Sequence, residues 1–90
     1  MKCAEILVTG KVQGVWFRDF VKKTASRLDV CGWVKNNSDG SVSTFVEGDE
    51  ETVNQLINNL KIGSLLSKVE DVKVNWLHFN NKFNSFKIIQ

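Results

Sequence analysis

The spacing of apolar residues changes along the chain in the order strand, helix, strand, strand, helix, strand, and this order constrains the fold more than any other feature. Helical spacing predicts helices over residues 17–28 and 50–61. Alternating apolar residues predict strands over residues 4–9, 30–36, 41–47 and 72–77 and in a short last segment through Phe86 and Ile88. The chain therefore contains two halves of the β-α-β type.

Two such halves fit an α+β fold, the ferredoxin-like βαββαβ sandwich, in which right-handed crossovers place two helices on one face of an antiparallel sheet. The usual strand order of that sandwich is 4-1-3-2, so the third strand would separate the strands that carry Cys3 and Cys31. Two interstrand steps of about 4.8 Å each exceed the roughly 7 Å that limits the Cα separation of bridged cysteines. We therefore expect no disulfide between these two residues.

Composition narrows the possible functions. With 90 residues the chain can build one hydrophobic core but not two, so residues 1–90 are expected to form a single domain. The net charge of +2 lacks the basic excess typical of nucleic-acid-binding domains. No apolar run approaches the roughly 20 residues of a spanning helix, and the cysteines lack zinc-site spacing. We expect a cytoplasmic monomer with reduced thiols, and no metal, nucleic acid or membrane as partner.

The segment over residues 10–18 (GKVQGVWFR) joins the first predicted strand to the first predicted helix, where free backbone N–H groups can bind an anion. Gly14 tolerates the torsions of a tight loop, and Arg18 carries a planar guanidinium that suits phosphate. The segment matches neither the Walker loop nor the dinucleotide-binding motif. The alternative is an ordinary turn whose surface Arg18 pairs with a carboxylate.

A second segment, residues 32–40 (GWVKNNSDG), ends the second predicted strand and enters a hairpin turn. The amide of Asn36 can donate and accept hydrogen bonds at once, as a residue that holds a water molecule needs to do. The alternative is that Asn36 caps or bends the strand end, since Asn is common in turns.

Together the two segments resemble the acylphosphatases. Residues 10–18 match the family's G-x-V-Q-G-V-x-F-R motif, and residues 32–36 and 39–42 match its G-W-V-x-N and D-G-x-V elements in the same order. The resemblance implies one acylphosphatase-like domain over residues 1–90 with the ferredoxin-like fold. It also implies hydrolysis of the carboxyl-phosphate bond of acyl phosphates without a metal or cofactor. Inorganic phosphate would be a product and a competitive inhibitor.

The resemblance further implies roles for individual residues. Arg18 matches the family's phosphate-binding arginine, and Asn36 matches the asparagine that positions the attacking water. The phosphate-binding amides would belong to Gln13, Gly14, Val15, Trp16, Phe17 and Arg18. Two segments depart from the family pattern, namely residues 63–68, which contain no proline, and residues 86–90, which lack the usual terminal arginine.

The leaving group explains why no catalytic histidine or carboxylate pair is needed. A carboxylic acid with a pKa of about 4 to 5 departs as an anion at neutral pH without a general acid. Positioning and charge stabilisation by amides and Arg18 would then suffice. The competing hypothesis is a non-catalytic module of the same fold that binds a phosphorylated metabolite or a protein. A third, a single-stranded RNA binder, lacks the sequence element of such domains.

Overall fold

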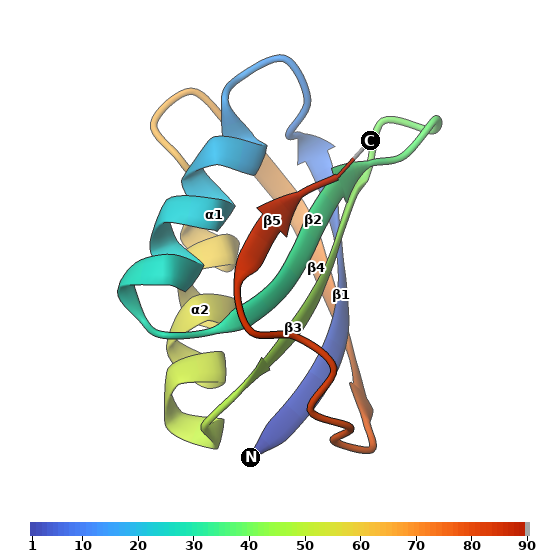
Figure 1. Cartoon of the computed structure of the whole chain (residues 1–90). Helices are drawn as coiled ribbons and strands as arrows, with labels where there is room; N and C mark the ends of the chain where they lie inside the picture. The colour runs from blue at the N-terminus through green and yellow to red at the C-terminus, as the bar shows by residue number, and fades with distance from the viewer. Residues whose placement is uncertain (90) are drawn as a thin grey trace.

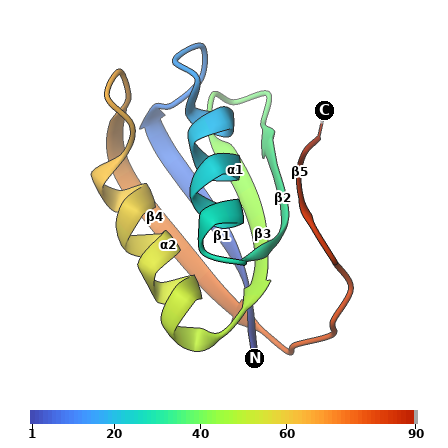
Figure 2. The same ribbon diagram turned by 60° about the vertical axis from the view of Figure 1, so that its left-hand side comes forward.

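Two α-helices cover one face of a five-stranded β-sheet, and the other face carries no helix (Figure 1, Figure 2). The computed structural model describes residues 1–89. Its elements are β1 (Lys2–Lys11), α1 (Phe17–Arg27), β2 (Cys31–Asn36), β3 (Val42–Gly48), α2 (Glu50–Ile62), β4 (Lys68–Leu77) and β5 (Phe86–Ile88). All predicted elements are present, and β4 begins earlier than predicted. None of the described helices has the length and apolar character needed to cross a membrane.

The sheet has the strand order β4-β1-β3-β2-β5, and its first four strands pair antiparallel in the predicted order. β5 instead pairs in parallel with β2, so that Phe86 lies opposite Gly32 and Ile88 lies opposite Val34. The antiparallel sandwich predicted from the sequence is therefore confirmed for the first four strands, and the short last strand adds a parallel edge that was not predicted. The reason is chain direction, because β5 starts where β4 ends and returns along the direction that β1 and β2 share (Figure 1).

The core lies between the sheet and the helices, because alternate strand residues point toward the helical layer. Ala4, Ile6 and Val8 of β1 are buried, as their alternation predicts. Val72 and Val74 of β4 are partly buried against the same core. The buried residues of both helices lie at the helical spacing that the sequence predicts. They are Phe17, Val21, Thr24 and Ala25 in α1 and Val53, Leu56, Ile57 and Leu60 in α2.

Cys3 and Cys31 both lie beside Glu47 of β3, which is paired with Cys3 on β1 and with Cys31 on β2. As expected, β3 separates the strands that carry the two cysteines, and both thiols are free. Burial, reinforced by the nearby Glu47 carboxylate, raises the pKa of the Cys3 thiol. The same carboxylate accepts hydrogen bonds from the backbone N–H groups of Lys82 (3.0 Å) and Phe83 (3.2 Å), which anchors the segment between β4 and β5.

Candidate active site

The loop between β1 and α1 has the backbone geometry of an anion-binding site. Gly14 (φ 71°) and Trp16 (φ 62°) both adopt left-handed torsions, and residues in that conformation are typical of the backbone concavities whose N–H groups bind anions. Trp16 is the N-cap of α1, and its side chain makes no capping hydrogen bond, so the first helical N–H groups stay available. An added Cβ at Gly14 would contact nothing within 4 Å, so the backbone angle, and not lack of space, favours glycine there.

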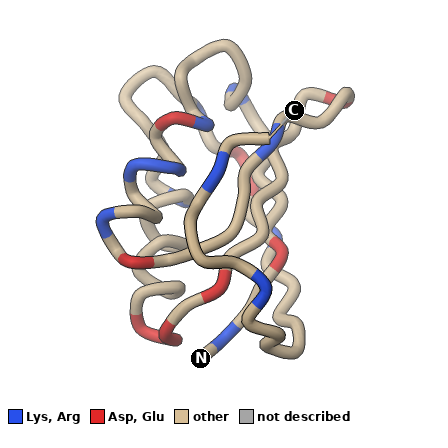
Figure 3. Tube along the Cα trace, in the orientation of Figure 1, with Lys and Arg blue, Asp and Glu red and all other residues tan. Residues whose placement is uncertain are grey.

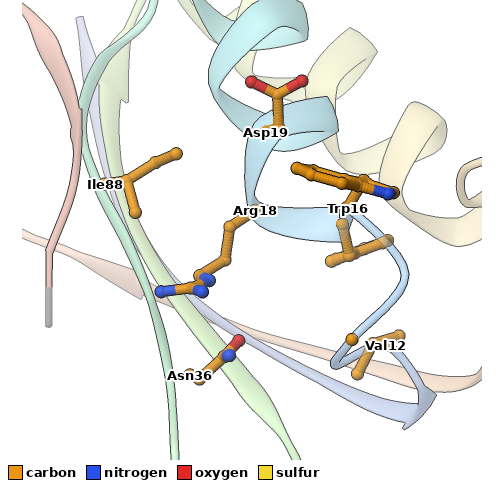
Figure 4. A pocket seen from close by; sticks show the side chains of 8 residues that line it. Val12, Trp16, Arg18, Asp19, Asn36 and Ile88 are labelled. Atoms are coloured by element: carbon orange, nitrogen blue, oxygen red, sulfur yellow. The ribbon is translucent and has the colours of Figure 1, made fainter.

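Arg18 and Asn36 line one pocket, although they come from different elements. Arg18 lies in the first turn of α1, and Asn36 is the last residue of β2. Figure 4 shows the guanidinium of Arg18 extending toward the amide of Asn36. The pocket has a volume of about 510 Å³ and is lined by Val12, Gly14, Trp16, Phe17, Arg18, Asp19, Asn36 and Ile88. The two side chains that the sequence singles out are thus brought together.

Among residues 1–89, Arg18 has no carboxylate partner of the kind that an ordinary surface arginine would have. Within residues 1–89 the ion pairs are Lys2–Glu50 and Lys23–Asp19, the second with Nζ and Oδ2 3.0 Å apart. Asp19, the neighbour of Arg18, is therefore neutralised by Lys23. Arg18 is also the one basic residue that lines the pocket, and other basic residues are scattered over the trace in Figure 3. Its charge is available to an anion.

Asn36 likewise has no partner among the described residues for its Oδ1 atom, which is buried. The following turn is held by other side chains. Asn37 Nδ2 donates to the hydroxyl oxygens of Ser41 (2.9 Å) and Ser43 (2.7 Å), and the Ser41 N–H donates to the Asp39 carboxylate (2.9 Å). The alternative role of Asn36 as a cap of the strand end therefore falls to its neighbours. A buried acceptor without a partner costs free energy unless a water or a ligand fills the gap.

The six residues predicted to offer backbone amides are placed differently. Gly14, Trp16, Phe17 and Arg18 line the pocket, whereas Gln13 and Val15 do not. The side chains of Val15 and Phe17 are buried in the core, so only their backbones can serve a ligand. Trp16 points outward and is 78% exposed.

Sequence reasoning missed what the side chain of Gln13 does. Its Nε2 donates to the carbonyl oxygens of Asn37 (2.7 Å) and Ser41 (2.8 Å). These two bonds tie the loop before α1 to the hairpin after β2, and so fix how Arg18 and Asn36 face each other. A loop glutamine gives no such signal in a single sequence, because both of its partners are backbone atoms distant in the chain.

Three further residues of the pocket wall were also missed, namely Val12, Asp19 and Ile88. Val12 and Asp19 flank the predicted segment closely enough to have been included. Ile88 belongs to β5 and reaches the pocket only because that strand pairs in parallel with β2. Its place depends on a pairing that a short strand does not reveal.

Residues 4–88 match the family model described as acylphosphatase. The chain belongs to the acylphosphatase family. Among its relatives, the acylphosphatase of Methanococcoides burtonii is 41% identical over 98% of this chain and 92% of that protein. The acylphosphatase of Salinibacter ruber is 43% identical over 90% of this chain and 85% of that protein. Because relatives named as this enzyme align with nearly the whole chain, the chain is itself an enzyme of the family.

Solved structures agree with this assignment. The acylphosphatase from Bacillus subtilis superimposes with a TM-score of 0.96 at 38% identity, with 100% of both chains covered. The acylphosphatase from Coxiella burnetii gives 0.93 at 33% identity, over 98% of this chain and 92% of that chain. Full-length HypF, solved in a phosphate- and nucleotide-bound form, gives 0.90 at 32% identity over 99% of this chain but 12% of that chain. The predicted ferredoxin-like fold is thereby confirmed.

Proposed function

We propose that this enzyme hydrolyses the carboxyl-phosphate bond of acyl phosphates to a carboxylate and inorganic phosphate. The loop over residues 13–18 and Arg18 bind the phosphoryl group, and Asn36 orients the attacking water. One observation carries the assignment: an arginine and an asparagine share one pocket at the start of α1, and within the described residues the arginine has no ion pair and the buried asparagine oxygen has no hydrogen-bond partner.

Phosphate binding follows from the charge and the donors in the pocket. The N–H groups at the start of a helix carry partial positive charge and bind phosphate oxygens directly. The guanidinium of Arg18 adds a full charge and a planar set of donors that can bind two phosphate oxygens. Donors held in place in this way stabilise the charge on the phosphoryl oxygens in the transition state.

Water activation needs no base in this arrangement. The amide of Asn36 does not titrate, so its free Oδ1 accepts a hydrogen bond from the water and aims a lone pair of that water at phosphorus. A bond forms between the water oxygen and phosphorus while the bond from phosphorus to the acyl oxygen breaks. The bonding electron pair leaves with the carboxylate, and a phosphoryl oxygen takes the proton. The carboxylate is stable as an anion at neutral pH, so no general acid is required.

Two variants with matched controls test these roles. Arg18→Ala is expected to lose both inhibition by inorganic phosphate and turnover of benzoyl phosphate, because the phosphate anchor is gone. Asn36→Ala is expected to keep phosphate binding and lose about 10²-fold or more in kcat, because only alignment of the water is lost. Arg27→Ala and Asn58→Ala, both at exposed helix positions, serve as controls.

Wild-type turnover by Arg18→Ala would contradict the phosphate-binding role. Equal losses of phosphate binding and kcat in Asn36→Ala would contradict the water-positioning role. Saturable binding of benzoyl phosphate to the wild-type chain without any turnover would instead favour the non-catalytic module of the same fold.

The proposal extends to a cytoplasmic monomer. Two free thiols suit a reducing compartment, and one chain supplies every residue of the pocket. Light scattering on the eluting protein should therefore give the mass of a single chain, 10.2 kDa. A mass of twice that value would contradict the monomer.

A further inference from the structure

A second hollow adjoins the phosphate pocket on its helix side. It has a volume of about 310 Å³ and lies between the start of α1 and the loop that precedes β4, with Trp16, Phe20, Leu65 and Leu66 in its wall. Trp16 and Asp19 line both the hollow and the pocket that contains Arg18. The two spaces therefore meet at these two residues, so a group that extends from the phosphate pocket past Trp16 would enter the hollow.

The wall of this hollow contains large apolar side chains that are exposed to solvent and do not take part in the core. Trp16 is 78% exposed, Leu65 is 99% exposed and Leu66 is 61% exposed. None of these side chains belongs to the core. Large apolar side chains that gather at the mouth of a site mark a surface that a ligand covers.

The backbone holds these side chains outward. The Ser64 N–H donates to the Ser67 hydroxyl (2.8 Å), and the Ser67 N–H donates back to the Ser64 carbonyl (3.1 Å), so Leu65 and Leu66 form the tip of a closed turn. These hydrogen bonds order the loop in which the family's proline is missing. On the other side, Trp16 is held in a left-handed conformation that is uncommon for a bulky residue.

The direction of the reaction leads to the same hollow. In an in-line displacement at phosphorus, the leaving group departs opposite the attacking water. Figure 4 shows Asn36 on the sheet side of the pocket and Trp16 and Asp19 on the helix side, with Arg18 between them. A water held at Asn36 therefore places the acyl group toward Trp16.

Charge in the hollow selects against ionic acyl groups. Its charged lining residues are Asp19 and Lys23, which form an ion pair with each other. The lining of the hollow therefore has no net charge that would attract a second ionised group, and its apolar side chains stay available to an apolar one. The matching ligand is neutral and apolar.

We propose that the acyl group of the substrate packs on Trp16, Leu65 and Leu66, so that the enzyme selects acyl phosphates with an aromatic or long aliphatic acyl group over acetyl phosphate. This inference rests on the proposed function. Apolar contacts of this size change kcat/KM by about 10-fold to 200-fold. We expect benzoyl phosphate to exceed acetyl phosphate by at least about tenfold.

The test measures kcat/KM for benzoyl phosphate and acetyl phosphate in the wild type and in a double variant, Leu65→Ser with Leu66→Ser. Ile62→Ser is the control, because Ile62 is equally apolar, 82% exposed and absent from both spaces. The double variant should lose about tenfold on benzoyl phosphate and keep its acetyl phosphate value. The control should keep both values. Circular dichroism verifies that each variant is folded, which the exposure of these positions favours.

Two outcomes would overturn the inference while leaving the proposed function intact. One is equal kcat/KM for the two substrates in the wild type. The other is a double variant in which both substrates are affected equally, or benzoyl phosphate is not affected at all. If the wild type turned over neither benzoyl phosphate nor acetyl phosphate, the proposed function would be contradicted, and this inference with it.

Discussion

Replacing Gln13 with alanine removes the two hydrogen bonds that join the phosphate-binding loop to the hairpin after β2. Each such bond contributes about 0.5–1.5 kcal/mol. Neither carbonyl is left without a donor, because the Gly40 N–H also reaches the Asn37 oxygen and the Asn37 N–H also reaches the Ser41 oxygen. We therefore expect the free energy of unfolding to fall by about 1–3 kcal/mol. For a domain of this size, Tm should then fall by about 4–24 °C.

Turnover should suffer more than stability. The loop carries the phosphoryl group and the hairpin follows Asn36, so loosening their link misaligns water and phosphorus. A displacement of about 1 Å can cost about 10²-fold in rate. We expect Gln13→Ala to lower kcat for benzoyl phosphate by up to that factor while Arg18 still binds inorganic phosphate.

The assay combines urea unfolding, followed by tryptophan fluorescence, with steady-state kinetics. Gln55→Ala is the matched control, since Gln55 is exposed on α2 and its side chain makes no hydrogen bond within residues 1–89. If Gln13→Ala and Gln55→Ala had the same free energy of unfolding and the same kcat, the side chain of Gln13 would have no positioning role.

Other predictions concern the sheet and the turn. Gly32→Ala should destabilise the protein by more than about 4 kcal/mol, since its Cβ would collide with the backbone carbonyl of Phe45 in β3. A folded variant with near-native Tm would refute this. Iodoacetamide should modify Cys31 before Cys3, because Cys3 is buried and its pKa is raised; equal rates by mass spectrometry would count against this. The Ser41 hydroxyl and N–H lower the pKa of Asp39, so its carboxylate adds stability above the unfolded pKa of about 3.9, which is lost as pH falls through the lower folded pKa. In urea unfolding, the difference in free energy of unfolding between the wild type and Asp39→Ala should therefore be largest at neutral pH. A difference that does not become smaller in acid would contradict this.

The fold was predictable where the sequence carries a clear period. Ala4, Ile6 and Val8 alternate cleanly, so their face and the layer they pack against followed directly. β5 could not be placed, because three residues show no period and the partner of such a strand depends on chain direction. The early start of β4 was missed because its first residues are mostly charged and it forms the sheet edge.

The candidate site was predictable at the level of motifs and not of contacts. Arg18 and Asn36 were identified because each sits in a motif at the end of an element, and the fold brings those ends together. A single sequence could not tell that Asn37, and not Asn36, would hold the turn, since two adjacent asparagines offer the same donors. The contribution of Ile88 depends on the pairing of β5 and was equally out of reach.

The position of bond cleavage tests the central claim most directly. Benzoyl phosphate is hydrolysed in water enriched in a heavy oxygen isotope, and both products are analysed by mass spectrometry after a single turnover per molecule. A water held at Asn36 attacks phosphorus, so the heavy oxygen should appear in inorganic phosphate and not in benzoate. Heavy oxygen in benzoate would mean that water attacks the acyl carbon, which would contradict the roles given to Asn36 and Arg18.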